Sequence, residues 1–158
     1  MKKRIAIIAT LVSLMPMGKT VLIVTGAVIT SAGFMLAASE KAYAENAEFY
    51  YKRAINKAEE GDFYGAIADY SKAIEINPRY SKAYNNRGNA KNDLKDYDGA
   101  IADYSKTIEI NPNNGSAYKN RGITKELIGD LKGACADWRR ASALGLKKTD
   151  LWILTQCY

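Results

Sequence analysis

The residues of this 158-residue sequence whose side chains could do chemistry include two cysteines and a pair of charged residues that recurs along the chain. Cys135 and Cys157 are not spaced as a zinc knuckle. The sequence has no histidine, which excludes imidazole general bases and most histidine-containing metal sites. It also has no glycine-rich phosphate loop of the P-loop type. We therefore expect a protein that is not an enzyme, without cofactor, metal or small-molecule substrate.

An arginine and an aspartate recur together three times along the chain. The pairs are Arg53 with Asp69, Arg87 with Asp103, and Arg121 with Asp137. They favour a ladder of ion pairs within or between helix hairpins, because a half-buried arginine needs a fixed carboxylate partner. The alternative is a stripe of arginines that binds an anionic ligand. Both interpretations require the same local structure to be built three times.

The sequence repeats with a period of 34 residues. GAIADYSKAIEINP, which starts at Gly65, returns as GAIADYSKTIEINP at Gly99, and 13 of the 14 letters agree. A degraded third version, GACADWRRASALGL, starts at Gly133. A fixed period of this length is typical of stacked repeats, in which neighbouring copies bury each other's apolar faces. The three copies span residues 47–80, 81–114 and 115–148.

Each copy is expected to form two helices joined by short turns. In the middle copy the helices are predicted at residues 81–94 and 97–109. Apolar residues in the second of them recur three and four positions apart, as on one face of a helix. Asp96 or Asp98 can cap its start, and Pro112 ends it because the residue before a proline leaves the α region.

Rows of equivalent residues resemble the tetratricopeptide repeat. The rows are Tyr50, Tyr84 and Tyr118; Ala54, Gly88 and Gly122; Ala66, Ala100 and Ala134; Tyr70, Tyr104 and Trp138; and Pro78 with Pro112. Two rows depart from the family pattern: the arginines stand where a leucine is usual, and Lys57, Lys91 and Lys125 where a tyrosine is usual. The resemblance implies an all-α fold, an α-solenoid of three helix hairpins. A C-terminal capping helix over residues 149–158 would cover the last hairpin, with Thr149 or Asp150 at its start.

The resemblance also implies that the first helix of each hairpin lines a concave face that binds partner proteins. The middle copy presents four asparagines there, although asparagine is a mediocre helix former. A hydrogen-bonding wall for an extended peptide is therefore favoured over a merely soluble helix face, and three lysines favour acidic residues in that peptide. The expected groove residues are Tyr51, Lys52, Lys82, Asn85, Asn86, Asn89, Asn92, Lys119 and Asn120. Ile55, Ile123 and Leu127 would add apolar surface at either end.

One binding mode of the family, a clamp for the tail of a chaperone, is not expected here. That clamp needs lysine and asparagine where the first copy has Tyr51 and Ile55. It also needs lysine and arginine where the third copy has Ser116 and Asn120. Asn86 matches, but one residue does not make the clamp.

The repeat pattern places the two cysteines on facing elements. Cys135 stands where the earlier copies have Ile67 and Ile101, a position that faces the first helix of the next copy. For Cys135 the next helix is the terminal one, which carries Cys157. Facing cysteines in an exported chain favour a disulfide. The alternative is a buried free thiol in place of isoleucine.

The first 44 residues have the composition of a targeting segment. A basic start, MKKR, precedes apolar stretches at residues 5–17 and 20–38 and the small-residue site Ala42-Tyr43-Ala44. This layout predicts a signal peptide, residues 1–44, cleaved after Ala44, and a repeat domain, residues 45–158, in the periplasm, an equivalent lumen or the medium. The alternative is an uncleaved anchor that contacts the membrane through residues 5–38, because residues 20–38 carry no charge and are long enough to span. The repeat domain would then also lie outside the cytoplasm.

The formal net charge of +6 belongs mostly to the targeting segment. Residues 45–158 carry only +2, which does not argue for nucleic acid as a partner. Arg139, Arg140, Lys147 and Lys148 form a local basic cluster, for which a solvated end face is favoured over a contact with an acidic partner or lipid headgroups.

The sequence thus predicts an exported bacterial-type repeat protein that acts as a non-enzymatic scaffold and binds an extended peptide of another protein. The alternative is a structural spacer or assembly subunit of a membrane-associated complex, anchored by its N-terminal apolar segment.

Overall fold

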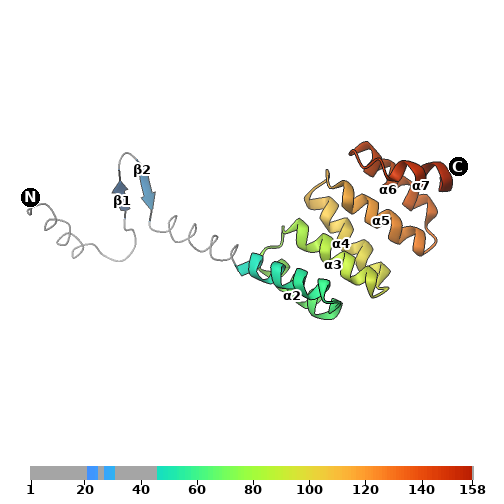
Figure 1. The fold of residues 1–158 in the computed structure, drawn as a ribbon. Coiled ribbons are helices and arrows are strands. Elements are labelled where there is room, and N and C mark those ends of the chain that lie inside the picture. The colour runs from blue at the N-terminus through green and yellow to red at the C-terminus, as the bar shows by residue number, and fades with distance from the viewer. Residues whose placement is uncertain (1–20, 25–26, 31–45, 158) are drawn as a thin grey trace, which may run out of the picture. The chain divides into compact units, whose positions relative to one another are not determined.

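The computed structural model describes residues 21–24, 27–30 and 46–157 (Figure 1). The chain divides into two compact units, residues 1–41 and residues 42–158, and each is described by itself. In the first unit, strand β1 (Val21–Val24) pairs antiparallel with β2 (Ala27–Thr30). Val21 lies opposite Thr30, and Val24 lies opposite Ala27. These strands fall within the apolar stretch predicted at residues 20–38.

The other features assigned to the N-terminal segment lie outside the described residues. They are the basic start, the first apolar stretch and the cleavage site after Ala44. Across residues 21–24, 27–30 and 46–157, no helix combines the length and the apolar character needed to cross a membrane.

The second unit is built from helices that pack in chain order, as Figure 1 shows. Over residues 46–157 there are seven of them, and the first, at residues 46–59, precedes α2. The others are α2 (Phe63–Ile76), α3 (Ser81–Asp93), α4 (Tyr97–Ile110), α5 (Gly115–Leu127), α6 (Leu131–Ala143) and α7 (Thr149–Gln156). The predicted all-α solenoid of three hairpins and a capping helix is confirmed for this unit. The predicted bounds of α3 and α4 are right to within one residue at each end.

The second helix of each hairpin begins in the same way. Asp62, Asp96 and Asp130 cap α2, α4 and α6, and each carboxylate accepts a hydrogen bond from the backbone N–H three residues later. Of the two caps considered for α4, Asp96 is therefore the one used. Asn77 and Asn111 end α2 and α4 directly before a proline, as expected.

The predicted cap of α7 is wrong. Lys148 precedes the helix and makes no capping bond with its side chain. Thr149 is fully buried and donates its hydroxyl hydrogen to the carbonyl oxygen of Leu146, at 2.7 Å. Asp150 instead accepts a hydrogen bond from Ser142 on α6. Asp150 thus holds the capping helix to α6, whereas Thr149 bonds to the turn directly before the helix, and neither side chain caps the helix.

The small-residue row lets the two helices of a hairpin approach closely. A Cβ atom on Gly122 would lie 2.5 Å from Nε1 of Trp138, and one on Gly88 would lie 2.8 Å from the ring of Tyr104. Trp138 and Tyr104 are almost fully buried. A large aromatic residue on the second helix therefore packs against a glycine on the first helix, which gives the dense packing of a protein interior.

Candidate functional site

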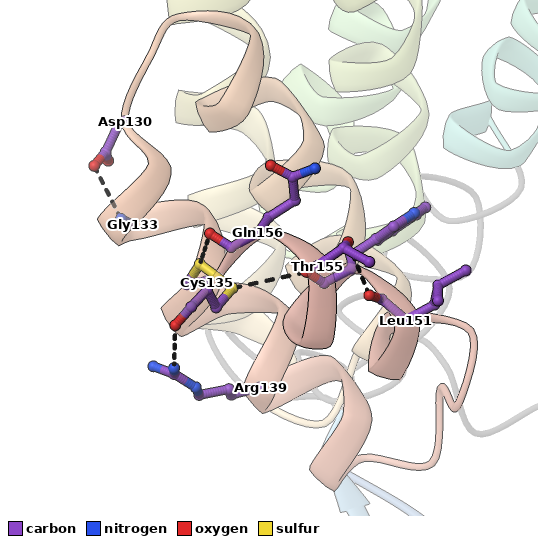
Figure 2. Close-up of a disulfide and its surroundings, with 9 residues drawn as sticks. Asp130, Gly133, Cys135, Arg139, Leu151, Thr155 and Gln156 are labelled. Carbon is purple, nitrogen blue, oxygen red and sulfur yellow. Dashed lines mark hydrogen bonds between the residues drawn. A yellow bond between two sulfur atoms is a disulfide. The ribbon is translucent and has the colours of Figure 1, made fainter.

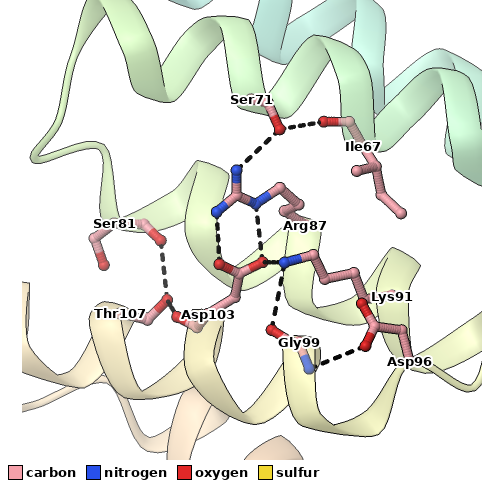
Figure 3. A network of polar contacts seen from close by, with 9 residues as sticks. All are labelled: Ile67, Ser71, Ser81, Arg87, Lys91, Asp96, Gly99, Asp103 and Thr107. Atoms are coloured by element: carbon pink, nitrogen blue, oxygen red, sulfur yellow. Dashed lines mark hydrogen bonds and ion pairs between the residues drawn. The ribbon is translucent and has the colours of Figure 1, made fainter.

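The arginine and aspartate of each hairpin form a two-pronged ion pair, shown for the middle hairpin in Figure 3. Nε and Nη2 of Arg87 donate to the two carboxylate oxygens of Asp103, at 2.9 and 2.7 Å. Nζ of Lys91 adds a third contact, at 2.8 Å. The side chain of Asp103 is 5% exposed, so its charge needs these partners. The lysine contact was not foreseen, although Lys91 follows Arg87 by four residues and so shares its helix face.

The same arrangement recurs in the other hairpins, and it also joins one hairpin to the next. Nη1 of Arg87 donates to the hydroxyl oxygen of Ser71 on α2, and Nη1 of Arg121 to that of Ser105 on α4, both at 2.9 Å. Hydrogen bonds from Arg53 lower the pKa of Asp69 to about 2. Arg87 and Arg121 are largely buried in the stack, and the more exposed Arg53 is also paired with its aspartate. This supports the ion-pair ladder and not the anion-binding stripe.

The asparagines of the first helices bond mainly across neighbouring hairpins. Nδ2 of Asn86 donates to the hydroxyl oxygen of Tyr51 at 3.2 Å. Nδ2 of Asn120 donates to Oδ1 of Asn89 at 2.9 Å. The hydroxyl of Thr124 donates to Oδ1 of Asn92 at 3.0 Å. These contacts form an amide ladder that gives the asparagines a structural role beside the predicted one.

The amide ladder extends into the hairpin interior through Tyr104, which belongs to the row Tyr70, Tyr104 and Trp138. The buried Tyr104 donates its hydroxyl hydrogen to Oδ1 of Asn89, at 2.8 Å. Nδ2 of Asn85 donates to Oδ1 of Asn86, at 3.2 Å. Oδ1 of Asn85 is buried and has no partner among the described residues. The middle helix α3 is thus held by polar contacts on the face that was expected to bind a partner.

Two pockets adjoin on this face and form one groove. One, of about 320 Å³, lies between α3 and α5, and the other, of about 300 Å³, lies between the first helix, α2 and α3. Asn89 and Asp93 line both pockets, so the two lie side by side. We call their combined lining the first-helix groove: Ile55, Ala58, Glu59, Phe63, Tyr70, Asn86, Asn89, Ala90, Asn92, Asp93, Tyr104, Asn120, Ile123 and Thr124.

The predicted groove residues divide between this surface and its surroundings. Four asparagines line the two pockets: Asn86, Asn89, Asn92 and Asn120. Lys52 lines neither pocket and pairs with Glu48 at 3.5 Å. Lys82 lines a separate pocket of about 530 Å³, together with Glu48. Tyr51, Asn85 and Lys119 line neither of the two groove pockets.

Three aromatic residues of the groove were not expected from the sequence. Phe63, Tyr70 and Tyr104 belong to second helices, whereas the expectation placed the groove on first helices alone. Tyr70 and Tyr104 belong to a row that resembles the repeat family, and both are buried. A ring that fills the hairpin interior can still present one edge to the groove, and sequence periodicity does not resolve this.

A disulfide joins Cys135 of α6 to Cys157, directly after α7, as Figure 2 shows. The two Cα atoms lie 5.7 Å apart. Beside the bond, the ring centroids of Trp138 and Trp152 lie 5.4 Å apart. Nη2 of Arg139 donates to the carbonyl oxygen of Cys157 at 3.4 Å. These contacts fasten the capping helix to the last hairpin.

The neighbouring basic cluster stays at the surface. Arg139, Arg140, Lys147 and Lys148 are all exposed. Within the described part of the chain, no group of three cysteine, aspartate or glutamate side chains is placed to hold a metal ion.

Comparison with known proteins finds repeats in two overlapping segments. A family model described as "Tetratricopeptide repeat" matches residues 81–114, and one described as "TPR repeat" matches residues 57–92. An uncharacterized protein of Methanocaldococcus jannaschii is 40% identical over 43 residues. That segment is 27% of this chain and spans only half the length of the curated relative.

Solved structures resemble the helical unit over nearly their whole length. The TPR2B domain of yeast Sti1, in its complex with pHsp70, superposes with a TM-score of 0.68 at 21% identity, over 72% of this chain and 97% of that one. The first TPR of Spaghetti (RPAP3), bound to the HSP90 peptide SRMEEVD, gives a TM-score of 0.64 at 21% identity, over 71% and 96%. At sequence identities this low, the structural similarity establishes a shared fold alone.

Proposed function

Since residues 46–157 form a tetratricopeptide-repeat fold, we propose that this chain is a non-enzymatic scaffold that binds an extended segment of a partner protein along the first-helix groove. The observation that carries the proposal is that two adjoining pockets together span three hairpins. The similar domains of Sti1 and Spaghetti are described as complexes with chaperone peptides, which supports a protein as partner. The chaperone itself is not proposed here, because the clamp residues differ at Tyr51, Ile55, Ser116 and Asn120.

The groove can recognise both the backbone and the side chains of a bound chain. Asparagine amides both donate and accept hydrogen bonds, as a peptide backbone does. Ile55 and Ile123 supply apolar surface in the two pockets. The exposed Lys52 and Lys82, on the first helices of the first two hairpins, would favour acidic residues of the partner near them.

We also propose that the protein acts outside the cytoplasm. The N-terminal composition and the disulfide between Cys135 and Cys157 support this, because disulfides persist in oxidising compartments. Whether the N-terminal segment is removed or retained as an anchor decides between a free scaffold and a membrane-associated one.

The test blocks the groove without touching its hydrogen bonds. Asn86 and Asn120 are poor choices, because their amides bind neighbouring hairpins and their loss would weaken the fold. Ala58 lines the groove, and Ala58→Trp should fill the pocket of about 300 Å³. Partners captured by the full chain are identified by mass spectrometry, and their affinity for the variant should fall at least about tenfold. The matched control is Ala68→Trp, at an exposed position on α2.

Two outcomes separate the candidate functions. If Ala58→Trp releases the partner and Ala68→Trp retains it, binding occurs in the groove. If both variants bind as the unaltered chain does, and changes at the exposed Arg139 and Arg140 abolish binding, the groove is not the site. The chain would then act as a spacer or assembly subunit that uses its end face.

A further inference from the structure

The pocket between the first helix, α2 and α3 combines an acidic rim with apolar and aromatic walls. Ile55, Ala58 and Phe63 supply the apolar part, and Tyr70 lies beside them. Glu59 and Asp93 supply the acidic part, from two neighbouring hairpins, and Asn86, Asn89 and Ala90 of α3 complete the lining. Both acidic residues are exposed. No lysine or arginine lines this pocket.

The charges of Glu59 and Asp93 are not used by the fold. Neither carboxylate takes part in a salt bridge or a side-chain hydrogen bond recorded for residues 46–157. In contrast, the buried Asp69 and Asp103 each hold an arginine and a lysine. The negative charge facing the groove is therefore available to a ligand.

Tyr70 marks a difference between the first and the middle hairpin. In the middle hairpin the equivalent Tyr104 donates its hydroxyl hydrogen to Asn89. In the first hairpin the residue equivalent to Asn89 is the apolar Ile55. Tyr70 is 2% exposed, so its ring belongs to the hairpin interior beside Ile55. The first hairpin therefore offers an apolar wall where the middle hairpin offers an amide.

We propose that this pocket receives a basic side chain, in the first place an arginine, of the peptide bound in the groove. Its methylene groups would pack on Ile55 and Ala58, and its guanidinium group would lie between Glu59 and Asp93. Arginine is favoured over lysine because a planar guanidinium group can also stack on the ring of Phe63. The proposal rests on the proposed peptide-binding function and specifies the chemistry of the partner.

Glu59 and Asp93 lie further along their helices than the exposed Lys52 and Lys82. Along the first helix, Lys52 and Glu59 are seven residues apart, which corresponds to about 10 Å of helix axis. An extended chain projects alternate side chains in opposite directions. A peptide that crosses the helices can therefore place acidic residues near the lysines and a basic residue in the pocket. The expected preference for acidic residues then holds only for the part of the peptide near the lysines.

The experiment uses peptides selected from a displayed library of random extended sequences on the full chain. We expect arginine or lysine at one fixed place in the selected peptides. Replacing that arginine by citrulline, which has nearly the same shape but no charge, should weaken binding at least about tenfold, as the loss of a charge-assisted hydrogen bond does. The double variant Glu59→Gln with Asp93→Asn should weaken the arginine peptide to a similar extent.

A double-mutant cycle makes the assignment specific. In the double variant, arginine and citrulline peptides should bind about equally. The matched control, Glu126→Gln, removes an exposed charge on α5 that does not line this pocket, and it should preserve the preference for arginine.

The possible results distinguish this proposal from the proposed function. Selected peptides that are displaced by Ala58→Trp but bind citrulline as well as arginine would overturn the basic-residue assignment and leave the groove in place. Selected peptides that bind the Ala58→Trp variant as tightly as the unaltered chain would overturn both proposals. A selection that yields no binding peptide would also count against both.

Discussion

Arg87, Lys91 and Asp103 show how charged residues that could bind a ligand are instead used by the fold. The carboxylate of Asp103 is buried and accepts hydrogen bonds from both basic side chains. Removing water from a charge is costly, so a buried carboxylate persists only when such partners replace its hydration. The exposed Glu59 and Asp93 have no such partners, which is why ligand binding is assigned to them and not to the buried row.

At this scale the middle ion pair should be a major contributor to stability. We expect Asp103→Asn to lower the free energy of unfolding by about 3 kcal/mol, because it leaves Arg87 and Lys91 half-buried without their carboxylate. Urea denaturation measures this. The control Asp98→Asn, at an exposed position in the first turn of α4, should change stability by less than about 1 kcal/mol. Equal effects of the two substitutions would contradict the structural role of Asp103.

Acid should weaken the fold through Asp69. Its folded-state pKa is lowered to about 2, first by the hydrogen bonds from Arg53 and then by Lys57, whereas an unfolded aspartate titrates near 3.9. The stabilisation is therefore fully present above about pH 4 and is lost as the pH falls towards 2. Denaturant midpoints measured from pH 6 to pH 2 should fall less steeply in Asp69→Asn than in the unaltered chain. Parallel curves would show that Asp69 does not contribute.

At the scale of the element, α7 depends most on tertiary contacts. It has only eight residues and no capping bond from a side chain at its start. An isolated helix this short is not stable in water. Its attachment comes from the disulfide, from the contact of Trp152 with Trp138, and from the hydrogen bond between Ser142 and Asp150. Without α7, the buried face of α6 that carries Ala134 and Trp138 would be open to solvent.

Removing the disulfide should therefore loosen α7 before it affects the rest of the stack. We expect Cys157→Ser to lower stability by roughly 3 kcal/mol in the chain-entropy model and to speed amide hydrogen exchange in residues 149–157. The hairpin helices α3 and α4 should keep their protection. Thiol counting under denaturing, non-reducing conditions tests the bond itself, and two free thiols in the natively exported protein would refute it.

At the scale of the whole molecule, the stack has few hairpins and each is held by its neighbours. Arg87 and Arg121 each bond to a serine of the preceding hairpin, and the amide ladder joins the first helices. In a repeat protein, stability is close to a sum of hairpin and interface terms. A partner that spans all three hairpins would consequently stabilise the whole unit and not one hairpin alone.

The export of the protein is a prediction that rests on its first 44 residues. We expect the mature protein to begin at Glu45, because a signal peptide is cleaved after a small residue that follows the apolar run. N-terminal sequencing of protein from its native host decides this. An intact N-terminus in protein that only detergent extracts would establish the anchored form instead.

The sequence alone determined the repeat, its period and the bounds of α3 and α4 to within a residue. It narrowed the cap of α4 to Asp96 or Asp98 and favoured the pairing of arginine with aspartate. All of these follow from local rules or from a spacing that recurs three times, so each copy supports the others. The sequence also placed Cys135 and Cys157 on facing elements, where the structure has a disulfide.

The tertiary structure decided which polar groups remain free for binding. The asparagines were expected to face a partner, yet Asn86 and Asn120 bond to residues more than thirty positions away in the sequence. Phe63 and Tyr70 reach the groove from a second helix, and Glu59 and Asp93 meet at one pocket from different hairpins. Such assignments depend on distances between elements, and a sequence pattern fixes the face of a helix but not what lies opposite that face.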